Sequence, residues 1–160
     1  MADAARANAA LIERFYSAFA RRDVETMLSC YRPEVVFCDP VFGALTGPRV
    51  PAMWRMLNAR AVDLAVEFDE VAATGSGGSA HWEARYTYTA TGRPVHNRID
   101  ASFEFRDGSI ARHVDRFSLW RWAAMALGIQ GALLGWLPPV RSAIRARAAE
   151  ALAAYMAANP

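Results

Sequence analysis

The sequence predicts an α+β fold: a cone-shaped, strongly bent antiparallel sheet packed against N-terminal helices, with extra helices at the C-terminus. Two observations predict it. Apolar residues recur with a helical period near the N-terminus and again towards the C-terminus, whereas they alternate with a period of two in the middle of the chain. Helices and strands are thus segregated along the chain, which is typical of α+β domains.

The first helix is indicated by Leu11, Phe15 and Phe19, which fall on one face at i, i+4 and i+8. Asp23 follows and suits the N-cap of a second, short helix, because its carboxylate can accept from the exposed amides of the first turn. A third helix is expected after Gly47-Pro48, since proline is tolerated in a first turn.

Alternation begins at Val62 and predicts a first long strand that ends in the turn-rich segment 74–79. A long hairpin follows, with strands over residues 80–91 and 95–105. Asp107-Gly108 is a strong hairpin-turn signal. The last strand is expected from about Ile110 to Leu119.

The chain has 160 residues, of which 54% are hydrophobic, enough for one sizeable core. We predict a cone domain over residues 1–120 and a helical extension over residues 121–160 that packs on the same domain. The formal net charge of +2 gives no reason to expect nucleic acid as a partner.

Two cysteines, Cys30 and Cys38, lack the spacing of metal ligands or of a disulfide framework. We therefore expect no metal. The N-terminus has no long apolar segment of the kind found in secretory signals, so the expected location is cytoplasmic.

Strand parity places two polar residues of the last strand inside the cone. His113 and Asp115 share a face with Phe117 and Leu119. A buried polar group without a partner costs roughly 1–3 kcal/mol, so this pair must be matched by other polar groups. With Asp39 nearby, the pair is the best catalytic constellation in the sequence. The alternative is an internal hydrogen-bond clasp between the sheet and the helices.

The run from Asp23 to Gly43 reads as a short helix, a turn and a strand that ends at Asp39-Pro40. This order resembles the start of the nuclear transport factor 2-like fold, as found in ketosteroid isomerase and the SnoaL-like polyketide cyclases. The resemblance implies that Asp39 points into a deep apolar cone and can act as the proton-transferring base. The other interpretation of Asp39 is ordinary turn chemistry, because an acid often precedes proline in turns.

The resemblance does not extend to steroid isomerisation. Ungapped counting places the oxyanion-hole tyrosine of ketosteroid isomerase at Phe15, next to Tyr16. The second donor, a neutral aspartic acid, falls on Ala101. Both oxyanion donors are therefore missing.

Aromatic residues are the candidates for substrate binding, because they suit an apolar pocket. Tyr86 is additionally able to donate a hydrogen bond to a developing oxyanion. An aromatic core is the alternative for several of them. The candidates are Tyr16, Trp54, Trp82, Tyr86, Phe103 and Phe117.

Charged residues share the opposite parity on the two strands of the long hairpin, and we expect them to form a ladder on the outer sheet surface. The six residues are His81, Glu83, Arg85, His96, Arg98 and Asp100. Nuclear transport factor 2-like proteins often dimerise on this surface, so the resemblance implies a homodimer. Structural pairing is favoured over chemistry for these residues.

The segment from Leu119 to Leu137 is almost entirely apolar and is interrupted by glycines. Arg121 and Gln130 make a membrane-spanning helix the less favoured interpretation. A basic amphipathic helix follows. Three roles remain for the two segments: a cap on the cone, a dimer face or, as the least favoured, contact with a membrane surface.

Together these features predict a SnoaL-like protein with an apolar pocket for a small hydrophobic molecule. We expect cofactor-free acid/base chemistry, of isomerase, cyclase or hydratase type, on a hydrophobic carbonyl compound. Asp39 would be the base, and His113 and Asp115 an acid/base and orienting pair. The alternative is a non-catalytic ligand-binding or assembly module with the same fold.

Overall fold

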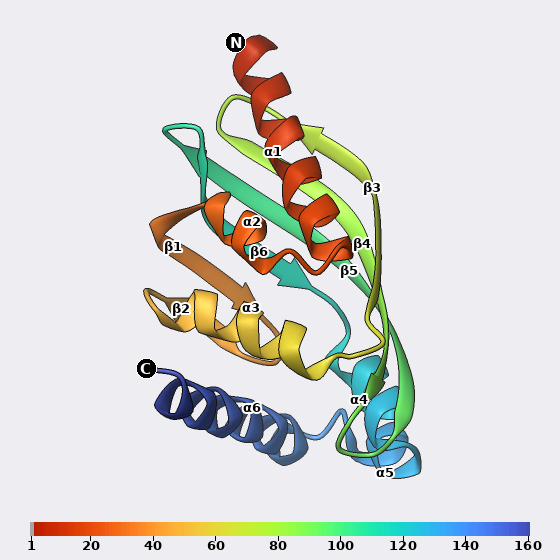
Figure 1. Ribbon diagram of the computed structural model, residues 1–160. Helices are drawn as coiled ribbons and strands as arrows, with labels where there is room; N and C mark the ends of the chain where they lie inside the picture. The colour runs from red at the N-terminus through yellow and green to blue at the C-terminus, as the bar shows by residue number, and fades with distance from the viewer. Residues whose placement is uncertain (1) are drawn as a thin grey trace.

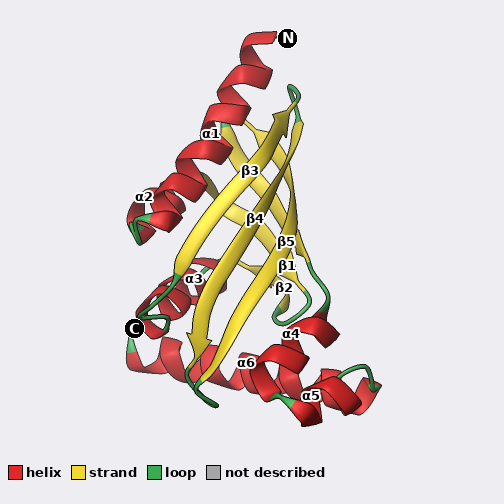
Figure 2. Cartoon of the chain, turned by 90° about the vertical axis from the view of Figure 1, so that its right-hand side faces the viewer, coloured by secondary structure: helices red, strands yellow, loops and turns green. Residues whose placement is uncertain are grey.

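The computed structural model describes residues 2–160. Its elements are α1 (Ala2–Ala20), α2 (Val24–Ser29), β1 (Tyr31–Asp39), β2 (Gly43–Thr46), α3 (Arg49–Arg60), β3 (Ala65–Ala73), β4 (Gly77–Tyr88), β5 (Arg93–Arg106), β6 (Ser109–Arg116), α4 (Leu119–Leu127), α5 (Ile129–Leu134) and α6 (Pro138–Ala158). Helices α1, α2 and α3 lie against one face of a curled sheet, and α4, α5 and α6 gather at one end of it (Figures 1 and 2). This arrangement confirms the α+β cone.

The single sheet has the strand order β2-β1-β6-β5-β4-β3. Neighbouring strands are antiparallel except β1 and β6, which run parallel with Phe37 opposite His113. The sheet is therefore antiparallel as expected, apart from this one pair. A tight hairpin forces two strands to run antiparallel, but β1 and β6 are joined through α3 and four other strands. Their relative direction is therefore set by packing.

Local sequence signals explain most element boundaries. The Asp23 side chain accepts a hydrogen bond of 3.1 Å from the Thr26 amide and caps α2 as expected. Asp107 and Gly108 have φ angles of 51° and 74°, as a two-residue hairpin turn requires. The last strand ends earlier than expected, at Arg116, because the Ser118 side chain accepts from the Arg121 amide and starts α4.

The predicted inward faces hold. Apolar side chains of β5, such as Ile99 and Phe105, are buried, and so are His113 and Asp115 of β6. The predicted alternation is wrong at its start, because Val62 is exposed and β3 begins only at Ala65. One core joins the sheet to α1, α2 and α3, and it also takes up Leu152 near the end of α6.

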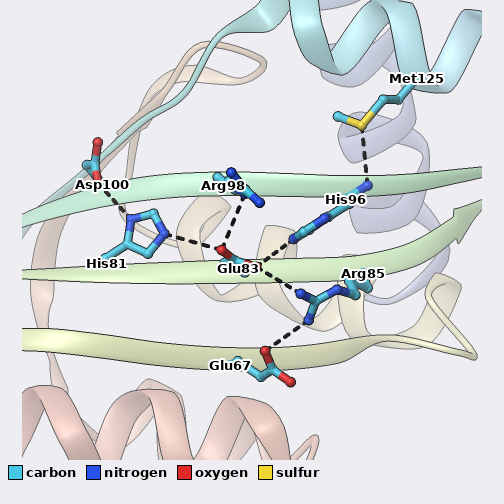
Figure 3. Close-up of polar contacts among 8 residues, drawn as sticks. All are labelled: Glu67, His81, Glu83, Arg85, His96, Arg98, Asp100 and Met125. Atoms are coloured by element: carbon cyan, nitrogen blue, oxygen red, sulfur yellow. Dashed lines mark hydrogen bonds and ion pairs between the residues drawn. The ribbon is translucent and has the colours of Figure 1, made fainter.

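The charge ladder forms on the outer face of the hairpin, as Figure 3 shows. His81 lies opposite Asp100, Glu83 opposite Arg98, and Arg85 opposite His96. Glu83 is its centre, with carboxylate oxygens 2.5 Å from His96 Nε2, 3.0 Å from Arg85 Nη2 and 3.4 Å from Arg98 Nε. The hydrogen bond with His96 lowers the pKa of Glu83, and the bond with Asp100 raises the pKa of His81. The six residues therefore form one connected network.

Helix α5 is pressed against α4. A Cβ added to Gly131 would lie 1.9 Å from the Ala123 carbonyl oxygen, so only glycine permits this approach. Helix α4 is in turn fixed to the end of the hairpin, where Thr91 Oγ1 donates to the Ala126 carbonyl and Arg93 Nε to that of Met125. No helix within residues 2–160 is both long and apolar enough to cross a membrane.

Candidate functional site

A cavity of about 560 Å³ lies between the sheet, α3 and α6. Its walls are mainly apolar. Helix α6 contributes one face, including Val140, Ile144 and Ala148, and so covers the cavity. The C-terminal segment thus contains a cap on the cone, the first of the three roles considered for it.

Asp39 lies at the end of β1 and borders the cavity. Its Oδ1 atom accepts from the amides of Val41 at 2.9 Å and Phe42 at 2.5 Å, which fixes the turn after the strand. Burial, with a smaller contribution from the neighbouring Asp115, nevertheless raises the pKa of Asp39 to about 7 despite these two donors. One carboxylate oxygen of Asp39 therefore accepts the hydrogen bonds of the turn, and the group titrates near neutral pH.

Asp115 is the lateral neighbour of Asp39. In the parallel pair β1 and β6, Cys38 lies opposite Val114, so the next residues along, Asp39 and Asp115, follow side by side. Asp115 Oδ1 accepts from His113 Nε2 at 2.9 Å and from Trp82 Nε1 at 3.2 Å. Both acids border the cavity, and both also border a second, more open groove on the outer side, which is lined by arginines of α6.

Each of the two carboxylates keeps one oxygen free. The Oδ2 atoms of Asp39 and Asp115 have no hydrogen-bond partner among residues 2–160, and neither is an enclosed atom. Since both residues line the cavity, these oxygens are available to a bound molecule. Two acids side by side, one with a pKa near 7, can take up and return a proton.

His113 does not border the cavity. It is 0% exposed and lies beneath the cavity, enclosed by aromatic rings, with Phe103 at 4.5 Å and Phe37 at 5.3 Å between ring centroids. Its Nδ1 atom lies 2.7 Å from the Tyr31 hydroxyl. The Tyr31 oxygen also accepts from Trp54 Nε1 at 3.2 Å. A continuous chain therefore links Trp54, Tyr31, His113, Asp115 and Trp82.

The hydrogen bonds that link these five side chains can all be satisfied with only one assignment of donors and acceptors. Because Trp54 donates to Tyr31, the Tyr31 hydroxyl hydrogen is left to donate to His113 Nδ1. His113 Nε2 then carries the proton and donates it to Asp115. Every buried polar atom in the chain has a partner, and the imidazole holds Asp115 in one orientation.

The predicted substrate-binding residues divide into two groups. Trp54, Trp82, Tyr86 and Phe117 border the cavity. Tyr16 and Phe103 are buried behind its wall, as is His113, so the expectation that all of these side chains line the pocket is wrong for those three. Parity indicates which way a side chain points but not how many layers of side chains lie in front of it.

Tyr16 allows a direct check of this placement. Its hydroxyl is fully buried without a partner among the described residues, and burial raises its pKa well above the usual value. Because Tyr16→Phe removes an unpaired polar group, we expect the free energy of unfolding to stay constant or to rise by roughly 1 kcal/mol. Urea unfolding would measure it. A clear loss of stability or of ligand binding would instead give the hydroxyl a role.

Three further residues belong to the site although the sequence did not single them out. Asn97 is buried on the cavity wall, and its parity with Ile99 was an available signal. Trp122 donates to the Tyr86 hydroxyl oxygen at 2.9 Å, which leaves the Tyr86 hydrogen free to donate. Tyr31 could not be found by parity, because the register of β1 shifts between Tyr31 and Val36.

Within residues 2–160, no group of three or more His, Cys, Asp and Glu side chains is arranged to hold a metal ion. The polar side chains that line the cavity include the two acids, Asn97, Tyr86 and Tyr88, together with Thr87, Thr89 and two arginines. The cavity can therefore bind an apolar molecule, and the acids that line it can exchange a proton with that molecule.

Several solved structures share this fold. TerC, co-crystallised with polyporic acid, is 19% identical, with a TM-score of 0.66 over 76% of this chain and 98% of that one. An epoxide hydrolase from M. tuberculosis is 18% identical, with a TM-score of 0.64 over 84% and 98% of the two chains. A protein of ketosteroid isomerase-like fold from Catenulispora acidiphila, in complex with trimethylamine, is 14% identical, with a TM-score of 0.65 over 80% and 97%.

A search of the curated proteins returned no match. The family model of the SnoaL-like domain matches residues 12–113, which hold the second half of α1, α2, α3, the first five strands and most of β6. The match covers more than half of the chain, and with the cone fold and its apolar cavity it establishes that the chain belongs to the SnoaL-like domain family.

Proposed function

We propose that this protein is an enzyme that performs cofactor-free proton transfer on a hydrophobic carbonyl compound in its cavity. The observation that carries the proposal is the free Oδ2 of Asp39, an acid whose pKa is about 7, at one end of an otherwise apolar pocket. A base with a pKa near the working pH combines a useful ionised fraction with a strong tendency to take a proton.

In this proposal the apolar body of the substrate packs against Trp54 and Trp82. Asp39 removes a proton next to the carbonyl group, and the same carboxyl returns it at another atom. Tyr86 donates its free hydroxyl hydrogen to the developing oxyanion, which is the role expected of a preorganised donor. Asp115, oriented by His113, maintains the negative field that keeps the pKa of Asp39 high.

The related structures support the substrate class. TerC was crystallised with polyporic acid, and another neighbour of the same fold is an epoxide hydrolase. Both names point to small organic molecules. The competing function is a non-catalytic binding module, for which the fully paired network around His113 is the favouring observation, because such a network also serves as an internal clasp.

A pH profile tests the proposal. Hydrophobic ketones, enones and epoxides would be screened for conversion by gas or liquid chromatography. For a converted compound we expect kcat/KM to rise with pH and to level off above about 7, because Asp39 accepts a proton only when ionised. Binding without conversion of any compound would favour the binding module. Conversion with a flat profile between pH 5 and 9 would exclude Asp39 as the base.

We also propose a homodimer that forms across the charge ladder. The ladder carries charges of both signs on one face, so a two-fold axis can place basic residues of one copy against acidic residues of a second copy. We expect light scattering to give twice the chain mass. A species of 17.6 kDa at all concentrations would contradict the dimer.

A further inference from the structure

Exposed apolar side chains are concentrated on α5 and the residues beside it. Six large hydrophobic side chains are exposed among residues 2–160, and five of them lie between positions 120 and 136. They are Trp120, Ile129, Leu133, Leu134 and Trp136. We call these five residues the α5 face. Ile129 is 79%, Leu133 66% and Trp136 63% exposed. All five residues lie outside residues 12–113, which the family model matches, and none of them lines the cavity.

The α5 face is rigidly built. Its inner side lies against Ala123 of α4, where an added Cβ would lie 1.9 Å from the Ala123 carbonyl oxygen at Gly131 and 3.0 Å from the Ala123 Cβ at Gly135. The apolar side chains therefore point outward because of close packing on the opposite side of the helix. In Figures 1 and 2 the helix lies at the extreme end of the molecule, opposite the N-terminus.

The indole N–H groups of both tryptophans in the α5 face donate hydrogen bonds within the protein and do not require water as an acceptor. Trp120 Nε1 donates to the Ala132 carbonyl at 2.9 Å, and Trp136 Nε1 donates to the Leu133 carbonyl at 3.0 Å. Transfer of these rings into an apolar medium consequently breaks no hydrogen bond. Exposed indoles with satisfied donors are suited to the boundary between headgroups and acyl chains.

Basic residues predominate in the segment that carries the α5 face. Residues 116–149 contain five arginines and no aspartate or glutamate. Arg116, Arg141 and Arg145 border one groove together with Trp120 and Trp136, so cations and indoles are neighbours in space. Asp39 and Asp115 also border that groove, at its junction with the cavity. All five arginines are exposed. Arg145 Nε donates to the Pro40 carbonyl at 2.9 Å, whereas the Arg141 side chain has no hydrogen bond or ion pair within residues 2–160 and can meet an anion.

We propose that the α5 face binds the surface of an anionic lipid bilayer. The apolar side chains enter the boundary of the acyl chains, and the arginines meet the lipid phosphates. Charge complementarity selects this partner over a second copy of the chain, because two such surfaces brought together would oppose arginines to arginines. The proposal rests on the surface alone and is independent of the chemistry in the cavity.

Vesicle co-sedimentation tests the proposal with the whole chain. Vesicles of phosphatidylcholine mixed with phosphatidylglycerol are expected to bind the protein, and added salt is expected to weaken this binding. Vesicles of phosphatidylcholine alone are expected to bind it less. We expect Leu133→Asp to lower the partition constant roughly tenfold or more. The matched control is Val62→Asp, which alters an equally apolar side chain, 80% exposed, outside this surface and should bind as the wild type does.

A second pair of variants separates charge from apolar contact. Arg141→Glu should lower binding to anionic vesicles by roughly 25-fold, since it changes the charge by two units and each unit near the surface contributes about a factor of five. Arg6→Glu, near the start of α1, whose N-terminal end lies far from α5 in Figure 1, should not change it. Absence of binding to anionic vesicles, or binding that is indifferent to both Leu133→Asp and Arg141→Glu, would overturn the proposal. A lipid-free dimer that Leu133→Asp dissociates would likewise overturn it and assign the surface to a second copy.

Discussion

Asp39→Asn is expected to lower turnover by roughly 10²–10⁴-fold while ligand affinity stays close to that of the wild type. Asparagine has the same shape, and its carbonyl oxygen can still accept from the amides of Val41 and Phe42. The turn after β1 is therefore kept. The second oxygen becomes an NH₂ group, which cannot take a proton from a substrate. Steady-state kinetics and calorimetric titration of the same compound would separate the two effects.

The control is Asp107→Asn, which makes the same replacement in an exposed hairpin turn and should leave turnover unchanged. Equal turnover by wild type and Asp39→Asn would remove Asp39 from the mechanism. An equal loss of turnover and affinity would instead mean that the side chain holds the ligand rather than reacting with it.

The pH dependence of the free energy of unfolding provides a second test of Asp39→Asn, because it depends on the raised pKa of Asp39. The folded-state pKa of Asp39 is about 7 against an ordinary value of 3.8, so the folded protein retains a proton that the unfolded chain has lost. Wild-type stability therefore falls as pH rises from about 4 to about 7. Asparagine never ionises. The stability advantage of Asp39→Asn should thus grow over this window, to about 2–4 kcal/mol, and stay constant above it.

His113→Ala is expected to reduce the free energy of unfolding by roughly 3–5 kcal/mol. The imidazole is fully enclosed, so its loss leaves a cavity, and it also leaves the Tyr31 hydroxyl and Asp115 without their shared partner. For a chain of this length the melting temperature should fall by roughly 6–20 °C. Thermal unfolding followed by circular dichroism would measure it.

His113→Gln provides the comparison for that variant. Glutamine can accept from Tyr31 through its oxygen and donate to Asp115 through its amide, so it should recover part of the lost stability. If His113→Ala melted like the wild type but had lost its activity, His113 would act in the reaction itself and not as the support that holds Asp115.

Much of the fold and of the polar centre was predictable because a strand has a strict period of two. Parity alone placed Asp115 on the inner face of β6, and the Asp-Pro pair marked Asp39 at the end of a strand. The same rule predicted the ladder on the outer face, where Glu83 has its four partners. These predictions depend on local backbone geometry, which the sequence encodes directly.

The alternating pattern could not predict how far a side chain lies behind the cavity wall, or which strands distant in the sequence pair with each other. Tyr16 and Phe103 point inward but lie behind other side chains, because layering depends on the curvature of the whole sheet. The parallel pairing of β1 with β6 and the register shift after Tyr31 arise from packing between segments distant in the chain. The partner that fixes His113 was for this reason invisible in the sequence.

The position of Asp39 and Asp115 between the covered cavity and the outer groove has a consequence for the timing of catalysis. On the proposed mechanism, a proton removed from a bound compound has a route to bulk water that does not pass beneath α6. The acids can exchange hydrogen with solvent while the cavity is still occupied. Asp39 can therefore exchange the removed proton for one from water before it returns a proton to the substrate, so that hydrogen at the new position comes partly from solvent.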